Sequence, residues 1–314
     1  MCGIVAYIGG HDATPIILNG LKKLEYRGYD SAGIAVLQNS HIELRREVGK
    51  LDLLLSLVKD QPLRGNLGIG HTRWATHGEP STRNAHPHMG ATGKVVVVHN
   101  GIVENYLEIR EELTSEGVKF NSETDSETIV HLVEKYLSLG LGLVEASRQA
   151  LQNLKGAHGV VIMSSSEPDK IIAARIGNAG GVVIGIGDDE MLIASDIPAI
   201  LEHTRKVVFL ESRQMAIVHN DSLEIQSLNG CRIAYQAHTV SWDPVSAEKG
   251  EYRHFMQKEI HEQVRSLTDT LAGRVNFEEA RIRLPQLNLD LTLANRINKI
   301  IITACGTAAH AGMV

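Results

Sequence analysis

The sequence opens with Met1-Cys2-Gly3-Ile4-Val5-Ala6-Tyr7-Ile8-Gly9, in which a cysteine directly precedes an apolar run typical of a buried strand. The small side chain of Cys2 favours removal of Met1, which would leave a thiol and a free α-amine on one residue. Their ordinary pKa values are about 8.5 and about 7.7–8.0, so part of the amine is unprotonated near neutral pH. The amine could then take the thiol's proton, as in a terminal nucleophile that is its own base. The alternative is that Cys2 is a small buried hydrophobe.

Composition argues against several classes of protein. The 314 residues, 43% of them hydrophobic, can bury a sizeable core in one or two domains. The net charge is -6 and no run of Lys or Arg occurs, so we expect no nucleic-acid partner. Three widely separated cysteines favour neither a disulfide framework nor a zinc site and suit a reducing cytosol. We also expect no secretory leader and no membrane span, because the sequence shows neither pattern.

Beyond the opening strand, the pattern predicts strands, a group of helices, and then strands again, without a βαβ rhythm. Helices are expected near 14–24, 51–58, 106–113, 129–137 and 143–154. Strands are expected near 34–37, 42–48, 66–71, 95–98, 159–164, 170–175, 181–185, 191–194, 207–209, 215–219 and 223–226. This order favours an antiparallel α+β layered fold. Residues 72–94 lack periodicity, and a loop of about twenty residues inside a compact domain indicates a function.

The pattern changes after residue 240. A charged helix at 252–271 is followed by a linker-like segment at 274–293 and an apolar strand at 299–302 that enters a glycine turn. We therefore predict one complete domain at 2–240, a linker with a helix at 241–295, and the truncated start of a second α/β domain at 296–314.

Six motifs follow one another along the chain. They are Cys2-Gly3-Ile4-Val5, Tyr26-Arg27-Gly28-Tyr29-Asp30-Ser31-Ala32-Gly33, His71-Thr72-Arg73-Trp74-Ala75-Thr76-His77-Gly78, Asn84-Ala85-His86-Pro87-His88, His99-Asn100-Gly101-Ile102-Val103-Glu104-Asn105 and Ser122-Glu123-Thr124-Asp125-Ser126-Glu127. Together they resemble the glucosamine-6-phosphate synthase family, the isomerising glutamine–fructose-6-phosphate aminotransferases, and the resemblance covers the whole chain.

The resemblance implies a class II glutamine amidotransferase domain of the N-terminal-nucleophile hydrolase fold, a four-layer α/β/β/α sandwich of two antiparallel sheets. The last residues resemble the start of a sugar-isomerase (SIS) domain. The implied reaction is hydrolysis of the side-chain amide of L-glutamine through a thioester on Cys2, without a cofactor. The ammonia would serve amino-sugar synthesis from fructose 6-phosphate in a full-length, cytoplasmic, homodimeric enzyme. The truncated chain should not carry out that second reaction.

Glutamine hydrolysis needs an oxyanion hole beside the nucleophile. Asn100 offers a side-chain N–H and Gly101 a backbone N–H at the end of a predicted strand, which suits the negative charge of a tetrahedral intermediate. The alternative is that Asn-Gly is simply a turn after a strand.

The substrate's charged ends need opposite charges. Arg73 would hold the carboxylate with its guanidinium fork, and by resemblance Asp125 would hold the ammonium. The alternatives are a surface ion pair for Arg73 and a helix N-cap for Asp125 or a neighbouring residue.

The resemblance assigns further residues to substrate binding. Trp74, Thr76 and His77 belong to a loop that would close over glutamine, although Trp74 could instead be a buried structural residue. Arg27 would lie beside the nucleophile and lower its pKa, or could be an ordinary solvent-facing residue. His86 is also assigned to the substrate. His77, His86, His88 and His99 could suggest a metal site, but their irregular spacing argues against one, and we expect none.

In the second domain, Cys305 and Thr307 are weak candidates for sugar-phosphate binding. Here Cys305-Gly306-Thr307-Ala308 stands where the family has Cys-Gly-Thr-Ser, so the serine hydroxyl that helps hold the sugar phosphate in the family is missing.

Two other functions remain open. The chain could be another class II amidotransferase, such as an amidophosphoribosyltransferase or an asparagine synthetase, although the Trp74 loop and the isomerase-like end argue against that. It could also be a module that senses glutamine without turnover, if Met1 were retained and the amine lost as a proton carrier.

Overall fold

The computed structural model describes residues 2–241, 252, 255–272, 274–276, 281–282, 291–304 and 306–314. The chain divides into two compact units, Met1–Glu248 and Lys249–Val314, and each is described by itself. The domain boundaries expected after residues 240 and 295 stay predictions.

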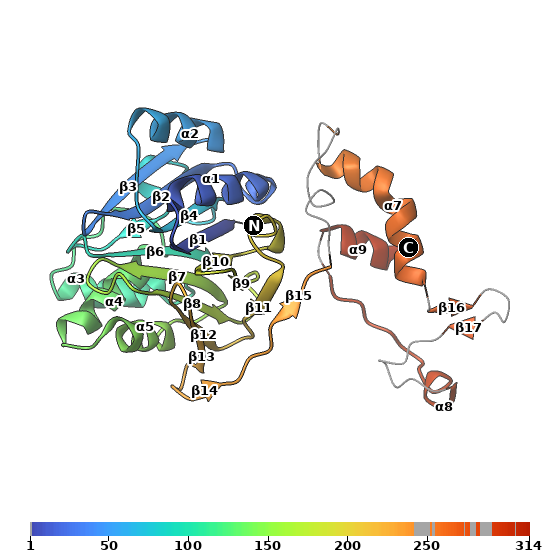
Figure 1. Ribbon diagram of the computed structural model, residues 1–314. Coiled ribbons are helices and arrows are strands. Elements are labelled where there is room, and N and C mark those ends of the chain that lie inside the picture. Colours follow the sequence, from blue (N-terminus) through green and yellow to red (C-terminus); the bar gives the residue numbers. More distant parts are fainter. Residues whose placement is uncertain are drawn as a thin grey trace. The chain divides into compact units, whose positions relative to one another are not determined.

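The first unit contains two antiparallel sheets (Figure 1). The strand order in the eight-stranded sheet is β15-β11-β9-β10-β1-β4-β2-β3, and in the seven-stranded sheet it is β14-β13-β12-β8-β7-β6-β5. The bounds of the first sheet's strands are β1 Gly3–Gly9, β2 Ser31–Gln38, β3 His41–Val48, β4 Leu67–Arg73, β9 Val183–Ile186, β10 Glu190–Ala194, β11 Lys206–Phe209 and β15 His238–Thr239. Those of the second are β5 His88–Met89, β6 Val95–Gly101, β7 His158–Ser164, β8 Ile171–Ile176, β12 Gln214–Val218, β13 Leu223–Ser227 and β14 Arg232–Ile233.

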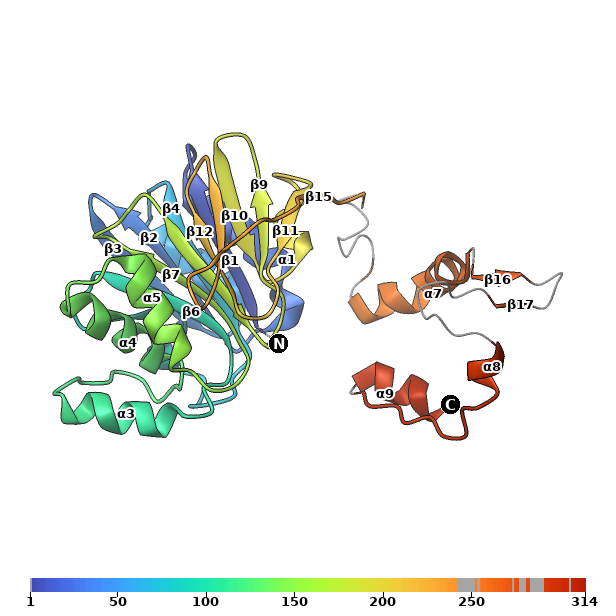
Figure 2. The same ribbon diagram turned by 90° about the horizontal axis from the view of Figure 1, so that it is seen from below.

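Helices cover the outer face of each sheet. Helices α1 (Ala13–Lys23) and α2 (Leu51–Asp60) lie over the eight-stranded sheet (Figure 1). Helices α3 (Tyr106–Ser115), α4 (Glu127–Ser138) and α5 (Leu143–Gln152) lie together beside the seven-stranded sheet (Figure 2). Short 3₁₀ turns occur at Glu25–Arg27, Thr82–Asn84 and Ile197–Ala199. The predicted four-layer α/β/β/α sandwich is confirmed.

Three apolar layers hold the sandwich together, and residue alternation along the strands decides which layer each side chain enters. In β1, Val5 and Tyr7 pack under the first helix layer, whereas Ile4, Ala6 and Ile8 enter the layer between the sheets. A third layer lies between the seven-stranded sheet and helices α3 to α5. Because β1 and β6 are buried on both faces, their sequences read as continuous apolar runs.

The second unit differs in part from expectation. Helix α7 (Phe255–Leu271) confirms the charged helix, although Tyr252 lies outside it. The linker-like segment contains a small hairpin of β16 (Val275–Asn276) and β17 (Arg281–Ile282), and short helices follow at α8 (Leu291–Ala294) and α9 (Gly306–Met313).

The predicted strand at 299–302 is wrong, because residues 297–304 are irregular and the Ile300, Ile301 and Ile302 side chains are exposed. An apolar run becomes a strand only where a neighbour pairs with it, and no strand pairs with this one in the described part of the unit. Within the described residues, no helix is both long and apolar enough to cross a membrane.

Candidate active site

The alternation of side chains along three strands brings the predicted catalytic residues to one end of the layer between the sheets. Cys2 directly precedes β1 and continues the face of Ile4 and Ala6. Arg73 ends β4 on the face of Ile69, and Asn100 lies near the end of β6 on the face of Val98. A pocket of about 520 Å³ opens here. It is lined by Cys2, Arg73, Trp74, Thr76, His86, His99, Asn100, Gly101, Ile102, Glu104, Thr124, Asp125, Ser126, Ala157 and Ala179.

The thiol of Cys2 lies against the start of the loop that follows β4. Its Sγ accepts a hydrogen bond from the backbone N–H of Trp74 at 3.2 Å. Burial raises the pKa of the Cys2 thiol, while the Trp74 N–H and the charges of Arg73 and Arg27 oppose part of that rise. The thiol is therefore mostly protonated at neutral pH and needs a base to become a nucleophile. The expected base, the α-amine of Cys2, depends on Met1, which lies outside the described residues.

Asn100 and Gly101 line the same pocket as Cys2. The Asn100 Nδ2 atom donates to the backbone carbonyl oxygen of Cys2 at 3.2 Å, so the amide nitrogen is directed towards Cys2. Gly101 has φ of +138°, and a Cβ there would lie 2.2 Å from the carbonyl oxygen of Ala157. Only glycine fits this position. The pair is not a hairpin turn, because β6 continues through Gly101 and helix α3 follows.

Arg73 is buried, and its guanidinium group faces its own loop as well as the pocket. It donates to the carbonyl oxygens of His77, Gly78 (3.1 Å) and Glu79 (3.5 Å). The side chain therefore shapes the loop from within, which rules out the surface ion pair.

Asp125 also lines the pocket and is buried. Its Oδ2 atom accepts the backbone N–H of Val103 at 2.7 Å, and no other described residue donates to this carboxylate. The N-cap of α4 is Ser126, without a side-chain cap bond, so the interpretation of Asp125 as the helix cap is wrong. The carboxylate instead ties the segment before α4 to the segment after β6, and one oxygen stays available to a ligand's ammonium group.

Of the remaining predicted residues, some line the pocket and others do not. Trp74 is 47% exposed, with its ring 5.7 Å from that of Tyr29, so it is not a buried structural residue. Thr76 and His86 line the pocket, whereas His77 lies against the Tyr106 ring at 5.4 Å and does not. Arg27 is also absent from the lining and is buried in an ion pair with Asp196 at 2.6 Å, so it is not solvent-facing.

Cys305 lies outside the described residues, and Thr307 lies in α9 of the second unit. No group of three or more His, Cys, Asp or Glu side chains suited to a metal ion is found in the described ranges.

His71 is a pocket neighbour that sequence reasoning missed. It precedes Arg73 by two positions on β4 and thus shares its face, which is the signal that could have found it. His71 and His86 are fully buried, with ring centres 4.2 Å apart, and burial lowers the pKa of His71 to about 3 and that of His86 well below its usual range. Both imidazoles are therefore neutral at physiological pH.

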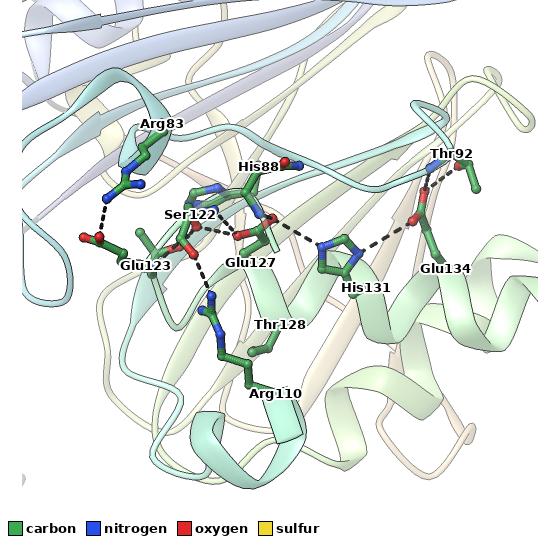
Figure 3. A network of polar contacts seen from close by, with 12 residues as sticks. Arg83, His88, Thr92, Arg110, Ser122, Glu123, Glu127, Thr128, His131 and Glu134 are labelled. Carbon is green, nitrogen blue, oxygen red and sulfur yellow. Dashed lines mark hydrogen bonds and ion pairs between the residues drawn. The ribbon is translucent and has the colours of Figure 1, made fainter. Parts of the chain in front are cut away.

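A buried polar network fixes the segment that carries Asp125 (Figure 3). The Glu127 carboxylate accepts the backbone N–H groups of Asn121 (2.7 Å) and Ser122 (2.6 Å), and also the Ser122 hydroxyl. On its other side it meets His131 Nε2 at 3.3 Å, and His131 in turn faces Glu134 at 3.8 Å. Burial lowers the pKa of His131, but the carboxylates of Glu127 and Glu134 outweigh it and raise the pKa above its ordinary value.

Replacing Glu127 by glutamine should lower the free energy of unfolding at neutral pH by about 3 kcal/mol, because it breaks a buried ion pair. Burial raises the pKa of Glu127, but hydrogen bonds from His131, Ser122 and Asn121 hold it at about 2. A carboxyl group whose pKa is lowered in the folded state stabilises the fold at pH values above its ordinary pKa, near 4.5. That stabilisation is lost as the pH falls towards 2. Urea unfolding at about pH 7 and about pH 3 should therefore show the difference between wild type and variant shrinking in acid.

The matched control is Glu112→Gln, which removes an exposed carboxylate from the surface pair between Glu112 and Lys135. This control should lower the free energy of unfolding by less than about 1 kcal/mol. If the free energies of unfolding of the wild type and Glu127→Gln differed equally at both pH values, the lowered pKa assigned to Glu127 would be contradicted.

Comparisons with known proteins find a similar domain family, similar sequences and similar structures. A model of the glutamine amidotransferase domain family matches residues 71–202. The isomerizing glutamine–fructose-6-phosphate aminotransferase of Caldanaerobacter subterraneus subsp. tengcongensis is 48% identical over 314 residues, which is 100% of this chain and 51% of that protein. The same enzyme of Methanosarcina acetivorans is 46% identical over 324 residues, covering 100% of this chain and 52% of that protein. The chain thus spans about half the length of these curated relatives.

Solved structures support the fold. The glutamine phosphoribosylpyrophosphate amidotransferase from B. subtilis, complexed with ADP and GMP, superposes with a TM-score of 0.63 at 24% identity, covering 72% of this chain and 49% of that chain. A glutamine aminotransferase class-II domain protein from Silicibacter pomeroyi gives a TM-score of 0.50 at 17% identity, covering 72% of this chain and 99% of that one.

Proposed function

Since this chain carries a glutamine amidotransferase domain and is related over its whole length to isomerizing glutamine–fructose-6-phosphate aminotransferases, we propose that it hydrolyses L-glutamine to glutamate and ammonia at Cys2. The observation that carries the proposal is the convergence in one pocket of a thiol, a side-chain amide, a buried arginine and a buried aspartate. Each meets one chemical need of an amino acid that is cleaved at its side-chain amide.

The reaction proceeds in two halves. The Cys2 thiol loses its proton to the α-amine that removal of Met1 creates, and the sulfur attacks the side-chain carbonyl carbon of glutamine. The carbonyl electron pair moves to oxygen, where N–H groups of Asn100 and Gly101 stabilise the charge. The C–N bond then breaks, the α-amine returns the proton to the leaving nitrogen, and ammonia departs. Water next cleaves the thioester, releasing glutamate and restoring the thiol.

The charged groups of the pocket position the substrate for this attack. We assign the α-carboxylate to Arg73, whose planar fork matches it, and the α-ammonium to Asp125. Trp74 and Thr76, in the loop that Arg73 shapes, would close over the bound amino acid and hold it against Cys2 during the attack. His77 and Arg27 have no direct contact with the substrate in this proposal. The backbone carbonyl oxygen of His77 accepts a hydrogen bond from Arg73 and so helps to hold that side chain. The positive charge of Arg27 lowers the pKa of the Cys2 thiol.

The acceptor of the ammonia follows from the relatives. We propose that it is fructose 6-phosphate, in a protein that also carries the half of those relatives that this chain does not match. A SIS domain beginning near residue 296, with Cys305 and Thr307 at its sugar-phosphate site, belongs to the same proposal. So does a homodimeric assembly of the longer protein. The cytoplasm is the compartment that suits a thiol nucleophile, because its reducing conditions keep cysteine free.

The purified chain supplied with glutamine should release glutamate and ammonia in equal amounts, measured by coupled enzymatic assays on the same samples. Asparagine is the control substrate, because its shorter side chain would not reach Cys2 once its charged ends are held. A chain that binds glutamine without releasing ammonia, and whose first residue is Met1, would support the glutamine-sensing alternative. Ammonia release without glutamate would contradict hydrolysis.

A further inference from the structure

His71 reaches the predicted oxyanion hole from behind. It lies on β4 between Ile69 and Arg73, on the face that enters the layer between the two sheets, and is fully buried. Its Nε2 atom lies 3.0 Å from Asn100 Oδ1 and 3.2 Å from the backbone carbonyl oxygen of His99, both on β6. The two sheets are thus joined by a polar contact directly next to the nucleophile.

The partners of His71 determine where its proton lies. A backbone carbonyl oxygen only accepts hydrogen bonds, and the buried Nδ1 atom of His71 has no partner, so we assign the hydrogen to the Nε2 atom that faces the His99 carbonyl. The imidazole is neutral, because burial lowers its pKa to about 3, and its single N–H is therefore at Nε2. The Nδ1 atom of His86, 3.1 Å from the same nitrogen, is then an acceptor as well.

This proton position decides which way the Asn100 amide points. An N–H at His71 requires an oxygen opposite it, which places Asn100 Oδ1 towards His71 and Nδ2 towards Cys2. A flipped amide would place its NH₂ group against the His71 N–H and its oxygen against the carbonyl oxygen of Cys2. Both contacts would then be repulsive, so His71 selects one of two orientations of similar shape.

The choice matters because the terminal torsion of asparagine is broad and roughly two-fold. Without a partner behind it, the amide could present either nitrogen or oxygen to the developing oxyanion. An oxygen there would repel the negative charge instead of stabilising it. Catalysis through an oxyanion hole depends on donors that are oriented before the reaction begins.

We propose that His71 is a positioning residue that holds the Asn100 amide with its N–H groups towards the oxyanion. This inference rests on the proposed glutamine hydrolysis and assigns His71 no contact with the substrate. We therefore expect loss of His71 to lower kcat and to leave KM nearly unchanged, because the oxyanion exists only after attack.

The test uses three variants of the chain. His71→Leu removes the donor at similar size and should lower kcat for glutamine hydrolysis by about ten- to 100-fold, less than the 10²–10³ expected when the oxyanion donor itself is lost, with KM little changed. His71→Gln restores an N–H donor and should recover most of the rate. In an Asn100→Ala background, His71→Leu should cause little further loss, because there is no amide left to orient. Thermal unfolding of each variant checks that it is folded.

Binding gives a readout that does not depend on turnover. The γ-aldehyde of glutamate should form a reversible tetrahedral adduct with the Cys2 thiol, and His71→Leu should weaken its binding by about the factor lost in kcat. A wild-type chain that binds the aldehyde but releases no ammonia would refute the proposed function while leaving the His71 test valid.

Three results would overturn the inference. The first is an unchanged kcat in a folded His71→Leu variant. The second is a Gln variant as slow as the Leu variant. The third is an equal loss from His71→Leu in the wild-type and Asn100→Ala backgrounds, which would show that His71 acts only on general packing.

Discussion

Replacing Cys2 by alanine should abolish ammonia release from glutamine, because no other described side chain can form the thioester in this pocket. Alanine is small enough to fit the position before β1 and to allow removal of Met1, so the fold should survive. Glutamine should still bind the variant, since Arg73 and Asp125 remain in place. Ammonia assays and calorimetric titration with glutamine on the same preparation measure both effects.

The chain offers a matched control in Cys231, which is exposed and does not line the pocket. Cys231→Ala should keep the full rate and should still be inactivated by a thiol reagent, whereas Cys2→Ala has no activity left to lose. Equal rates in Cys2→Ala and the wild type would remove Cys2 from the mechanism.

Asn100→Ala should lower kcat by about 10²–10³ with little change in KM, because it removes one donor to the oxyanion. Steady-state kinetics with glutamine separate the two parameters. The structural reason is the direction of the side chain, whose Nδ2 atom faces the Cys2 carbonyl. A variant that raised KM alone would place Asn100 in substrate binding instead.

Arg73→Lys provides the contrast, because Arg73 is assigned to substrate binding and not to the oxyanion. A lysine keeps the positive charge but cannot bind a carboxylate with two parallel N–H bonds, so KM should rise by about ten- to 100-fold. The kcat should fall less, because the contact exists before and during the attack. An unchanged KM would exclude Arg73 from the carboxylate site.

Much of the fold could be predicted because most strands of the sandwich carry a local signal. The apolar runs of β1 and β6 and the amphipathic faces of α1 and α4 are visible in the sequence. The pairing could not be predicted, since β1 lies between β4 and β10, which are distant in sequence. The two-residue strands β14 and β15 escaped prediction because so short a segment has no periodicity.

The site was predicted where a residue's chemistry and its strand position agree. Cys2, Arg73 and Asn100 lie at strand ends, and alternation directs all three into the layer between the two sheets. His77 and Arg27 were not brought to the pocket, because loop conformation decides their direction: one side chain meets Tyr106 and the other Asp196.

Polar contacts between residues distant in sequence could not be predicted from sequence patterns either. Asp125 in front of α4 has the pattern of a helix cap, yet it binds the backbone of Val103, which is near it only in the folded chain. The run at 299–302 has the pattern of a strand but no neighbour to pair with in the described part of its unit.

The most direct test of the account is the mass of the N-terminal peptide isolated from chain that is turning over glutamine and is stopped in acid. We expect a peptide that begins at Cys2 and carries one glutamyl group bound through sulfur, and we expect the group to be absent without glutamine. A peptide that retains Met1 in fully active protein would contradict the role of the α-amine. Active protein in which the glutamyl group is attached to any other residue would contradict the nucleophile itself.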